Sequence, residues 1–256
     1  MSASQAKGTR NKSAYLVAIV IILACWQVAA WFLPDFLMPD VPEAFVRLGQ
    51  ELTSQEFYAG LANSMSRLGI GYGLALLCGT VLGLLGGTVS LIRSPLKAAI
   101  IILQSIPSIA WVPLFLILMG FGNLPIIIVV AVGAFFPTAL SVMNATESVE
   151  KVHISAARVM GASRTQMLRR VYFPAVTPEL ITGAQLAFGN AWRALISAEM
   201  IVGFSAGLGR SLAYAGEIAD MTGVMTNILV IAVLAAIIDQ VILENIKHRL
   251  LRYQYL

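Results

Sequence analysis

Six long apolar stretches constrain this chain more than any other feature of its sequence. A helix of about twenty residues crosses the roughly 30 Å of hydrocarbon in a bilayer. Of the 256 residues, 58% are hydrophobic and 12% are charged, and the mean hydropathy is +0.82, a balance that excludes a soluble domain. We therefore predict an all-α integral membrane protein with six transmembrane helices, at residues 14–33, 68–92, 96–119, 124–143, 180–204 and 224–246.

Lysine and arginine are distributed unevenly between the segments that connect these stretches. If the amino terminus lies inside, the cytoplasmic segments hold thirteen of them and the opposite side holds only Arg47 and Arg210. Cytoplasmic loops of membrane proteins carry such an excess of basic residues. We therefore expect both termini in the cytoplasm. The net charge of +4 follows from this asymmetry, so it predicts no nucleic-acid partner.

A basic, amphipathic segment, residues 148–174, separates the fourth stretch from the fifth. At helical spacing its apolar and small residues share one face, whereas its basic residues point elsewhere. The shared face consists of Val152, Ala156, Val159, Met160, Ser163 and Met167. The pattern predicts a cytoplasmic helix on which another protein acts.

This segment resembles the coupling-loop signature of the permease subunits of bacterial ABC importers, which reads E-A-A, three residues, G, nine residues, I-x-L-P. Ala156-Ala157 and Gly161 match, the ending is Val171-Tyr172-Phe173-Pro174, and Ser155 replaces the glutamate. Small residues let a short helix sit deep in a partner's groove, and Gly161 permits a tight turn. The resemblance implies that the ATPase-coupling residues are Ser155, Ala156, Ala157, Arg158, Gly161, Ala162 and Ser163.

A wider resemblance, over about residues 60–250, is to the permeases of taurine, alkanesulfonate, nitrate and bicarbonate importers. It is carried by the third stretch around Gln104–Pro113, by Gly120-Phe121-Gly122-Asn123 and by Gly133-Ala134-Phe135-Phe136-Pro137. It implies a type I ABC importer permease in the bacterial inner membrane, with a second permease copy as a homodimer, two ABC ATPase subunits and a soluble binding protein that delivers a small anion.

The chain contains no G-x-x-x-x-G-K-[ST] phosphate loop. We therefore expect a transport subunit and not an enzyme, with ATP and Mg²⁺ bound by the partner ATPase and no cofactor or metal in this chain. The expected organisation is a cytoplasmic tail at 1–13, the first transmembrane helix at 14–33, an external segment at 34–66, the permease core at 67–250 and a cytoplasmic tail at 251–256.

Several polar residues within the apolar stretches are candidates for the translocation path. Two prolines, Pro107 and Pro113, break the third stretch, and irregular backbone at that depth requires a covering of protein or a water-filled path. In the fifth stretch a polar stripe includes Glu199, with Arg193 at its edge. Each of these charges needs the other, another polar group or water. The candidates, for the path or for structural contacts between helices, are Gln104, Trp111, Gln185, Trp192, Arg193 and Glu199.

Two other features of the apolar stretches bear on the fold and on competing functions. Gly79, Gly83 and Gly87 repeat at four-residue intervals, which predicts close helix packing. The run Gly203-Phe204-Ser205-Ala206-Gly207 fits the G-x-S-x-G pattern of serine hydrolases. However, a serine nucleophile needs a base, and both histidines, His153 and His248, fall on the opposite side of the membrane. We therefore favour an external turn that leads into a short re-entrant segment, residues 208–219.

A stand-alone channel or a secondary carrier is the remaining alternative. Carriers show repeated halves with broken helices at corresponding positions, and this sequence has one proline-broken stretch without a second. A coupling helix would also have no purpose in such a protein.

Overall fold

The computed structural model describes residues 3–34, 36–203 and 205–243, and the described residues are almost entirely helical, with no strand among them. The predicted tail at 251–256 and the last residues of the predicted core lie outside the described residues. The chain divides into two compact units. The smaller consists of residues 1–58 and 212–230, and the larger, here called the core, consists of residues 59–211 and 231–256.

The smaller unit is built around a reversal of the chain after its first helix. The indole nitrogen of Trp26 donates a hydrogen bond to the Pro39 carbonyl (2.9 Å), and the Gln27 amide bonds to Asp40 and to the Val41 amide. These bonds fix the start of the next helix, α2, in which Ala44 is fully buried. The helices of this unit are α1 (Ala3–Phe32), α2 (Val41–Glu51) and parts of α10 (Leu208–Glu217) and α11 (Met221–Ile237).

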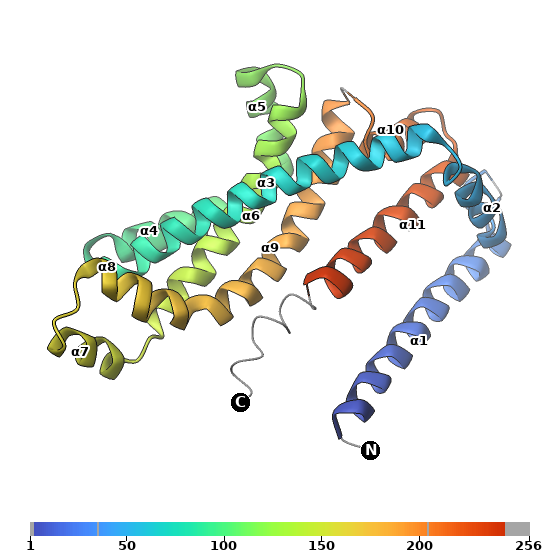
Figure 1. Ribbon diagram of the computed structural model, residues 1–256. Coiled ribbons are helices and arrows are strands. Elements are labelled where there is room, and N and C mark those ends of the chain that lie inside the picture. Colours follow the sequence, from blue (N-terminus) through green and yellow to red (C-terminus); the bar gives the residue numbers. More distant parts are fainter. Residues whose placement is uncertain (1–2, 35, 204, 244–256) are drawn as a thin grey trace. The chain divides into compact units, whose positions relative to one another are not determined.

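In the core, α6 packs extensively against α9 (Figure 1). Small and β-branched residues at their interface let the two helices approach closely. The core elements are α3 (Gln55–Thr88), α4 (Ser90–Gln104), a 3₁₀ turn (Ser108–Trp111), α5 (Val112–Met119), α6 (Asn123–Glu147), α7 (Lys151–Val159), α8 (Arg164–Met167), a π-helical turn (Leu168–Tyr172) and α9 (Phe173–Val202). The fully buried residues of the pair include Val129, Val130, Ala134, Ala187, Ala191 and Leu195.

The glycine stripe of α3 packs directly on α6, which confirms the close helix packing that its spacing predicts and identifies the partner helix. A Cβ atom added at Gly79, Gly83 or Gly87 would lie 2.5–2.9 Å from the Cβ of a side chain of α6. The opposing residues are themselves four apart, Thr138, Val142 and Thr146. The glycine side of α3 therefore lies in close contact with α6 along three successive turns.

The third apolar stretch is broken, as its prolines predict. Helix α4 ends at Gln104, a 3₁₀ turn follows Pro107, and α5 continues at an angle of 89° to α4, so that in Figure 1 it turns sharply away from it. Proline removes a backbone donor and clashes with the preceding turn, which ends α4 at this point.

Three described helices are long and apolar enough to cross a membrane, within α3, α6 and residues 221–240, and the bent pair of α4 and α5 makes a fourth if it is one span. In α1 the apolar part is shorter, residues 17–32. Helix α9 has the length of a span but carries Glu179, Arg193 and Glu199. The number of six transmembrane helices therefore remains a prediction.

Candidate functional site

The predicted coupling segment folds as a short helix, α7, that ends at a glycine turn. Gly161 has a φ of +76°, a left-handed conformation that side chains rarely adopt. The Gly161 amide donates to the Arg158 carbonyl and the Ala162 amide to the Ala157 carbonyl, each at 3.0 Å. These two bonds form a Schellman motif, which satisfies carbonyls at the helix end. The sequence-based expectation of a tight turn at Gly161 is thus confirmed.

The next helix starts with a capping box immediately after this turn. The Ser163 hydroxyl accepts a hydrogen bond from the Gln166 amide, and the Gln166 side chain accepts one from the Ser163 amide at 2.8 Å. Such reciprocal bonds satisfy two donors at a helix start. The angle between α7 and α8 is therefore set by residues 161–166, and α7 stands at one end of the core (Figure 1).

The face of α7 that the sequence groups together is uncovered in this chain. The side chains of Val152, Val159 and Met160 are 73%, 88% and 86% exposed, and Ala156 is also exposed. Met167, which the helical pattern placed on the same face, is buried instead, because the turn at Gly161 separates it from α7. If α7 faces the cytoplasm, as the sequence predicts, apolar side chains this exposed indicate an interaction site.

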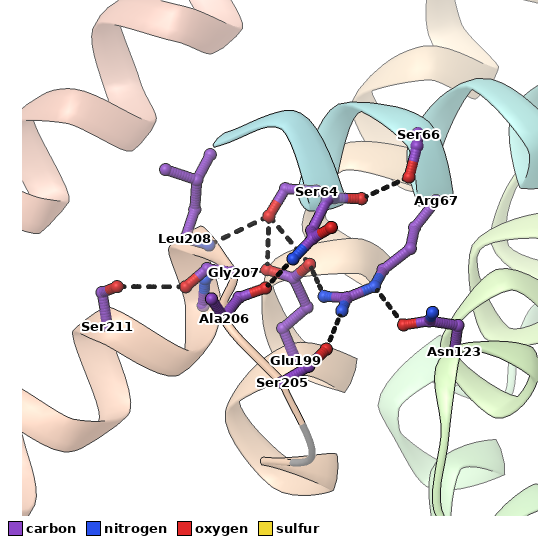
Figure 2. Close-up of polar contacts among 12 residues, drawn as sticks. Ser64, Ser66, Arg67, Asn123, Glu199, Ser205, Ala206, Gly207, Leu208 and Ser211 are labelled. Carbon is purple, nitrogen blue, oxygen red and sulfur yellow. Dashed lines mark hydrogen bonds and ion pairs between the residues drawn. The ribbon is translucent and has the colours of Figure 1, made fainter. Parts of the chain in front are cut away.

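A second polar site joins α3 to α9 at the end of α6 that is remote from α7. Arg67 Nη1 lies 2.5 Å from Glu199 Oε1, and the two residues are only 2% and 1% exposed. The Glu199 carboxylate also accepts hydrogen bonds from the Ser64 hydroxyl (2.8 Å) and the Gly209 amide (2.9 Å). Arg67 Nε donates to Asn123 Oδ1 at 2.9 Å (Figure 2). A buried ion pair is tolerated when its remaining groups are hydrogen-bonded in this way.

The loop before α10 is tied to the same ion pair. Arg67 Nη2 donates to the Ser205 hydroxyl, and Ser64 Oγ accepts from the Leu208 amide at 2.9 Å (Figure 2). Only glycine fits at position 207, because the Glu199 carboxylate occupies the space of a side chain. A Cβ at Gly207 would lie 2.7 Å from the Glu199 Cδ. Within the G-x-S-x-G pattern, Gly207 thus makes room for the ion pair and Ser205 forms a hydrogen bond with it.

These contacts argue against the hydrolase alternative. Ser205 lies near Asn123 at the start of α6, whereas His153 follows the end of that 25-residue helix, roughly 37 Å away at 1.5 Å per residue. His248 lies outside the described residues. The only charged group that bonds to the Ser205 hydroxyl within the described chain is a guanidinium, which is not a general base.

A pocket of about 310 Å³ opens where the break of the third stretch meets α6 and α9. Two of the six path candidates, Gln104 and Arg193, line it together. Arg193 is exposed, and its guanidinium donates to Asn190 Oδ1 at 2.7 Å. Ser108 and Ser197 add hydroxyl groups to the wall.

The other four path candidates do not line this pocket. Glu199 belongs to the buried ion pair, and Trp192 is buried against Phe188. Trp111 stacks on Phe115, and Gln185 donates to Asp239 at 3.3 Å.

Arg67 was not identified from the sequence as the partner of Glu199. The available signal was the same as for Glu199, since a charge among apolar residues needs a counter-charge.

Comparison with solved structures defines the class of fold. A chain of the MetNI methionine ABC transporter, solved in inward-facing conformations, matches with a TM-score of 0.64 at 23% sequence identity, over 76% of this chain and 95% of that one. The architecture is therefore that of a type I ABC importer permease, as the sequence predicts.

Sequence comparison identifies the family. The model of the binding-protein-dependent transport system inner membrane component matches residues 75–250. Over 226 residues the chain is 32% identical to the taurine transport system permease protein TauC of Escherichia coli, covering 86% of this chain and 82% of that protein. The chain belongs to this family and is a membrane-embedded transport subunit.

Two further relatives are also named as permease proteins of anion import systems. The putative aliphatic sulfonates transport permease protein SsuC of Bacillus subtilis is 27% identical over 93% of this chain and 87% of its own length. The nitrate import permease protein NrtB of Synechococcus elongatus is 27% identical over 73% of this chain and 71% of its own length.

Proposed function

We propose that this chain is the membrane subunit of an ATP-driven importer and that α7 is the element on which the ATPase acts. The observation that carries the proposal is the uncovered face of α7, with Val159 and Met160 exposed beside the small residues Ala156 and Ala157. A short helix with small and apolar residues fits a groove on a partner subunit, and the family matched by the chain supports an ATPase as that partner.

The proposed complex contains two permease copies, two ATPase subunits that bind ATP and Mg²⁺, and a soluble binding protein on the opposite side of the membrane. Closure of the ATPase dimer would move α7, and the rigid turn at Gly161 would pass this movement through α8 to α9. The proposed orientation places both termini and α7 in the cytoplasm, which the excess of lysine and arginine supports.

The solute we propose is a small anion. The relatives named for taurine, aliphatic sulfonates and nitrate support this class, because each of these solutes carries an oxyanion group. The binding protein would select the solute, and the permease would conduct it.

The test is co-expression and co-purification of the permease with candidate ABC ATPase subunits, followed by measurement of ATP hydrolysis in proteoliposomes. The variant Val159→Glu puts a charge on the uncovered face without disturbing a contact within this chain, since Val159 is 88% exposed. We expect it to weaken ATPase binding by at least about tenfold, because burying an unpaired carboxylate costs more than 1.4 kcal/mol.

Ser155→Glu is the matched control, because it adds the same charge where the family signature carries a glutamate. It should retain the ATPase. If Val159→Glu and a bulky replacement, Gly161→Leu, both leave ATPase binding and ATP-driven uptake unchanged, α7 is not the coupling element. A permease that conducts solute in the absence of the ATPase would instead support the channel or carrier alternative.

A further inference from the structure

Helices α3 and α9 each contain one arginine, and the two arginines have opposite surroundings. Arg67 is buried and neutralised by Glu199 at 2.5 Å. Arg193 is exposed and bonds to the neutral Asn190, and no carboxylate of the described residues forms an ion pair with it. An arginine within a membrane helix costs about 3 kcal/mol even on an insertion scale. Among the described residues the charge of Arg193 is therefore balanced by no carboxylate, and its exposed guanidinium is open to water or a mobile anion.

The pocket beside Arg193 has the size and the donors for a small ligand. Its volume of about 310 Å³ is at the lower end of the roughly 300–1,000 Å³ of small-molecule pockets. Arg193 is the only charged residue among the described residues that line it, so the pocket carries a net positive charge. The remaining polar groups are hydroxyls and amides, which also donate hydrogen bonds, from Gln104, Ser108, Asn190 and Ser197.

The backbone around the pocket is shaped by specific residues of the 3₁₀ turn after α4, of α6 and of α9. Pro107 ends the regular helix, which brings Ser108 to the wall. Gly133 of α6 permits the close approach of the other two elements, since a Cβ there would lie 3.0 Å from the Ala194 Cβ and 3.6 Å from the Ser108 Cβ. Pro137 has no N–H to offer the Gly133 carbonyl four residues earlier. The 3₁₀ turn, α6 and α9 thus form the pocket together.

We propose that this pocket is an oxyanion subsite of the translocation path, at which the Arg193 guanidinium binds a sulfonate, carboxylate or nitrate group. This assignment rests on the proposed function and adds the contact residues to it. A guanidinium presents a planar fork of donors that matches two oxygens of such a group. The Arg193 Nη2 donates to Asn190, and the remaining N–H donors of the Arg193 guanidinium are left for the ligand. Ser108 and Ser197 supply hydroxyls to the remaining oxygen.

The charge of the pocket can be measured with thiol reagents on the permease alone. The reporter is Ser197→Cys, in a background in which both native cysteines, the exposed Cys25 and Cys78, are replaced by alanine. Methanethiosulfonate reagents that carry an ethylsulfonate or an ethyltrimethylammonium group are compared. We expect the ratio of the anionic to the cationic reaction rate to exceed that of a free thiol by on the order of tenfold, because of the nearby positive charge.

The decisive variant is Asn190→Asp, which changes no heavy-atom positions and puts a carboxylate at the 2.7 Å contact with Arg193. It should abolish the preference for the anionic reagent. Asn144→Asp, at an exposed position of α6 that does not line the pocket, is the matched control and should leave the preference unchanged. Ethanesulfonate should slow the reaction of the reporter with the anionic reagent, whereas chloride at equal ionic strength should not.

An anionic-to-cationic rate ratio equal to that of a free thiol, or equal protection by ethanesulfonate and chloride, would overturn the subsite. If the Ser197→Cys protein does not fold, Ser108→Cys reports on the same pocket from the 3₁₀ turn. Because the reaction needs no ATPase, its outcome is independent of the proposed function. A complex that binds its ATPase normally but shows no anion preference at the reporter would refute the subsite and leave the importer assignment standing.

Discussion

Arg67 and Glu199, 132 residues apart in the sequence, form an ion pair at 2.5 Å that is almost completely removed from solvent. The pair links α3 to α9, and Asn123 and Ser205 extend it to α6 and to the loop before α10. Because each charge is neutralised and hydrogen-bonded, these elements are held as one body at this end of the core. A body of this kind transmits movement without deforming, which an alternating-access mechanism needs.

Removing one partner of this pair should destabilise the core strongly. In Glu199→Gln the Arg67 charge stays buried without a counter-charge, and loss of one member of a buried pair costs about 3–5 kcal/mol. The measurement is thermal unfolding of the purified permease in detergent. The double variant Arg67→Met with Glu199→Gln should be more stable than Glu199→Gln alone, since no isolated charge is left. Equal stability of Glu199→Gln and the unmodified protein would contradict the buried ion pair.

The contact between α3 and α6 predicts different effects of one substitution at two glycines of the same helix. Gly83→Ala would place a Cβ 2.6 Å from the Val142 Cβ and 2.7 Å from the Ala139 carbonyl, so the helices must separate. We expect a loss of about 1–3 kcal/mol, as for overpacking elsewhere. Gly73→Ala is the control, because a Cβ there meets no atom within 4 Å. It should be neutral or stabilising by up to about 1 kcal/mol.

The turn after α7 can be tested by hydrogen exchange. Gly161→Ala puts a side chain at a φ of +76°, which costs on the order of 1 kcal/mol. The amides of residues 161 and 162, which close the Schellman motif, should therefore exchange several-fold faster, in proportion to that cost. Gly49→Ala, in α2, has ordinary backbone angles and open space around the added Cβ, and it should leave exchange in α7 unchanged. Unchanged exchange at residues 161 and 162 in Gly161→Ala would show that the turn does not depend on glycine.

Features set by local chemistry could be predicted from the sequence. The break after Gln104 follows from proline, the turn at Gly161 from glycine, and the packing of α3 from glycines four residues apart. In each case the determinant lies within a few residues of its effect. The segment to which the resemblance assigns the coupling role could be located for the same reason, because its signature is continuous in the chain, and the role itself stays a proposal.

Features that depend on distant partners could not be predicted in this way. Helical spacing gives the angles between Trp192, Arg193 and Glu199 on α9, but it does not say which neighbour covers each side of the helix. In the structure Glu199 meets Arg67, Trp192 is buried, and Arg193 faces a pocket. The choice between two possible cations for Glu199 was decided by the packing of α3 on α6, which brings Arg67 near, and no sequence pattern contains that information.

The contacts of Ser205 and Gly207 show how a hydrolase signature can meet purely structural demands. Gly207 leaves the space that the Glu199 carboxylate fills, and the Ser205 hydroxyl accepts a hydrogen bond from the Arg67 guanidinium. Transporters that bury a carboxylate beneath a tight reversal of the chain will meet the same steric and polar demands. Pattern searches for esterases and proteases should accordingly recover such membrane proteins as false matches, recognisable by an arginine where the hydrolytic histidine ought to stand.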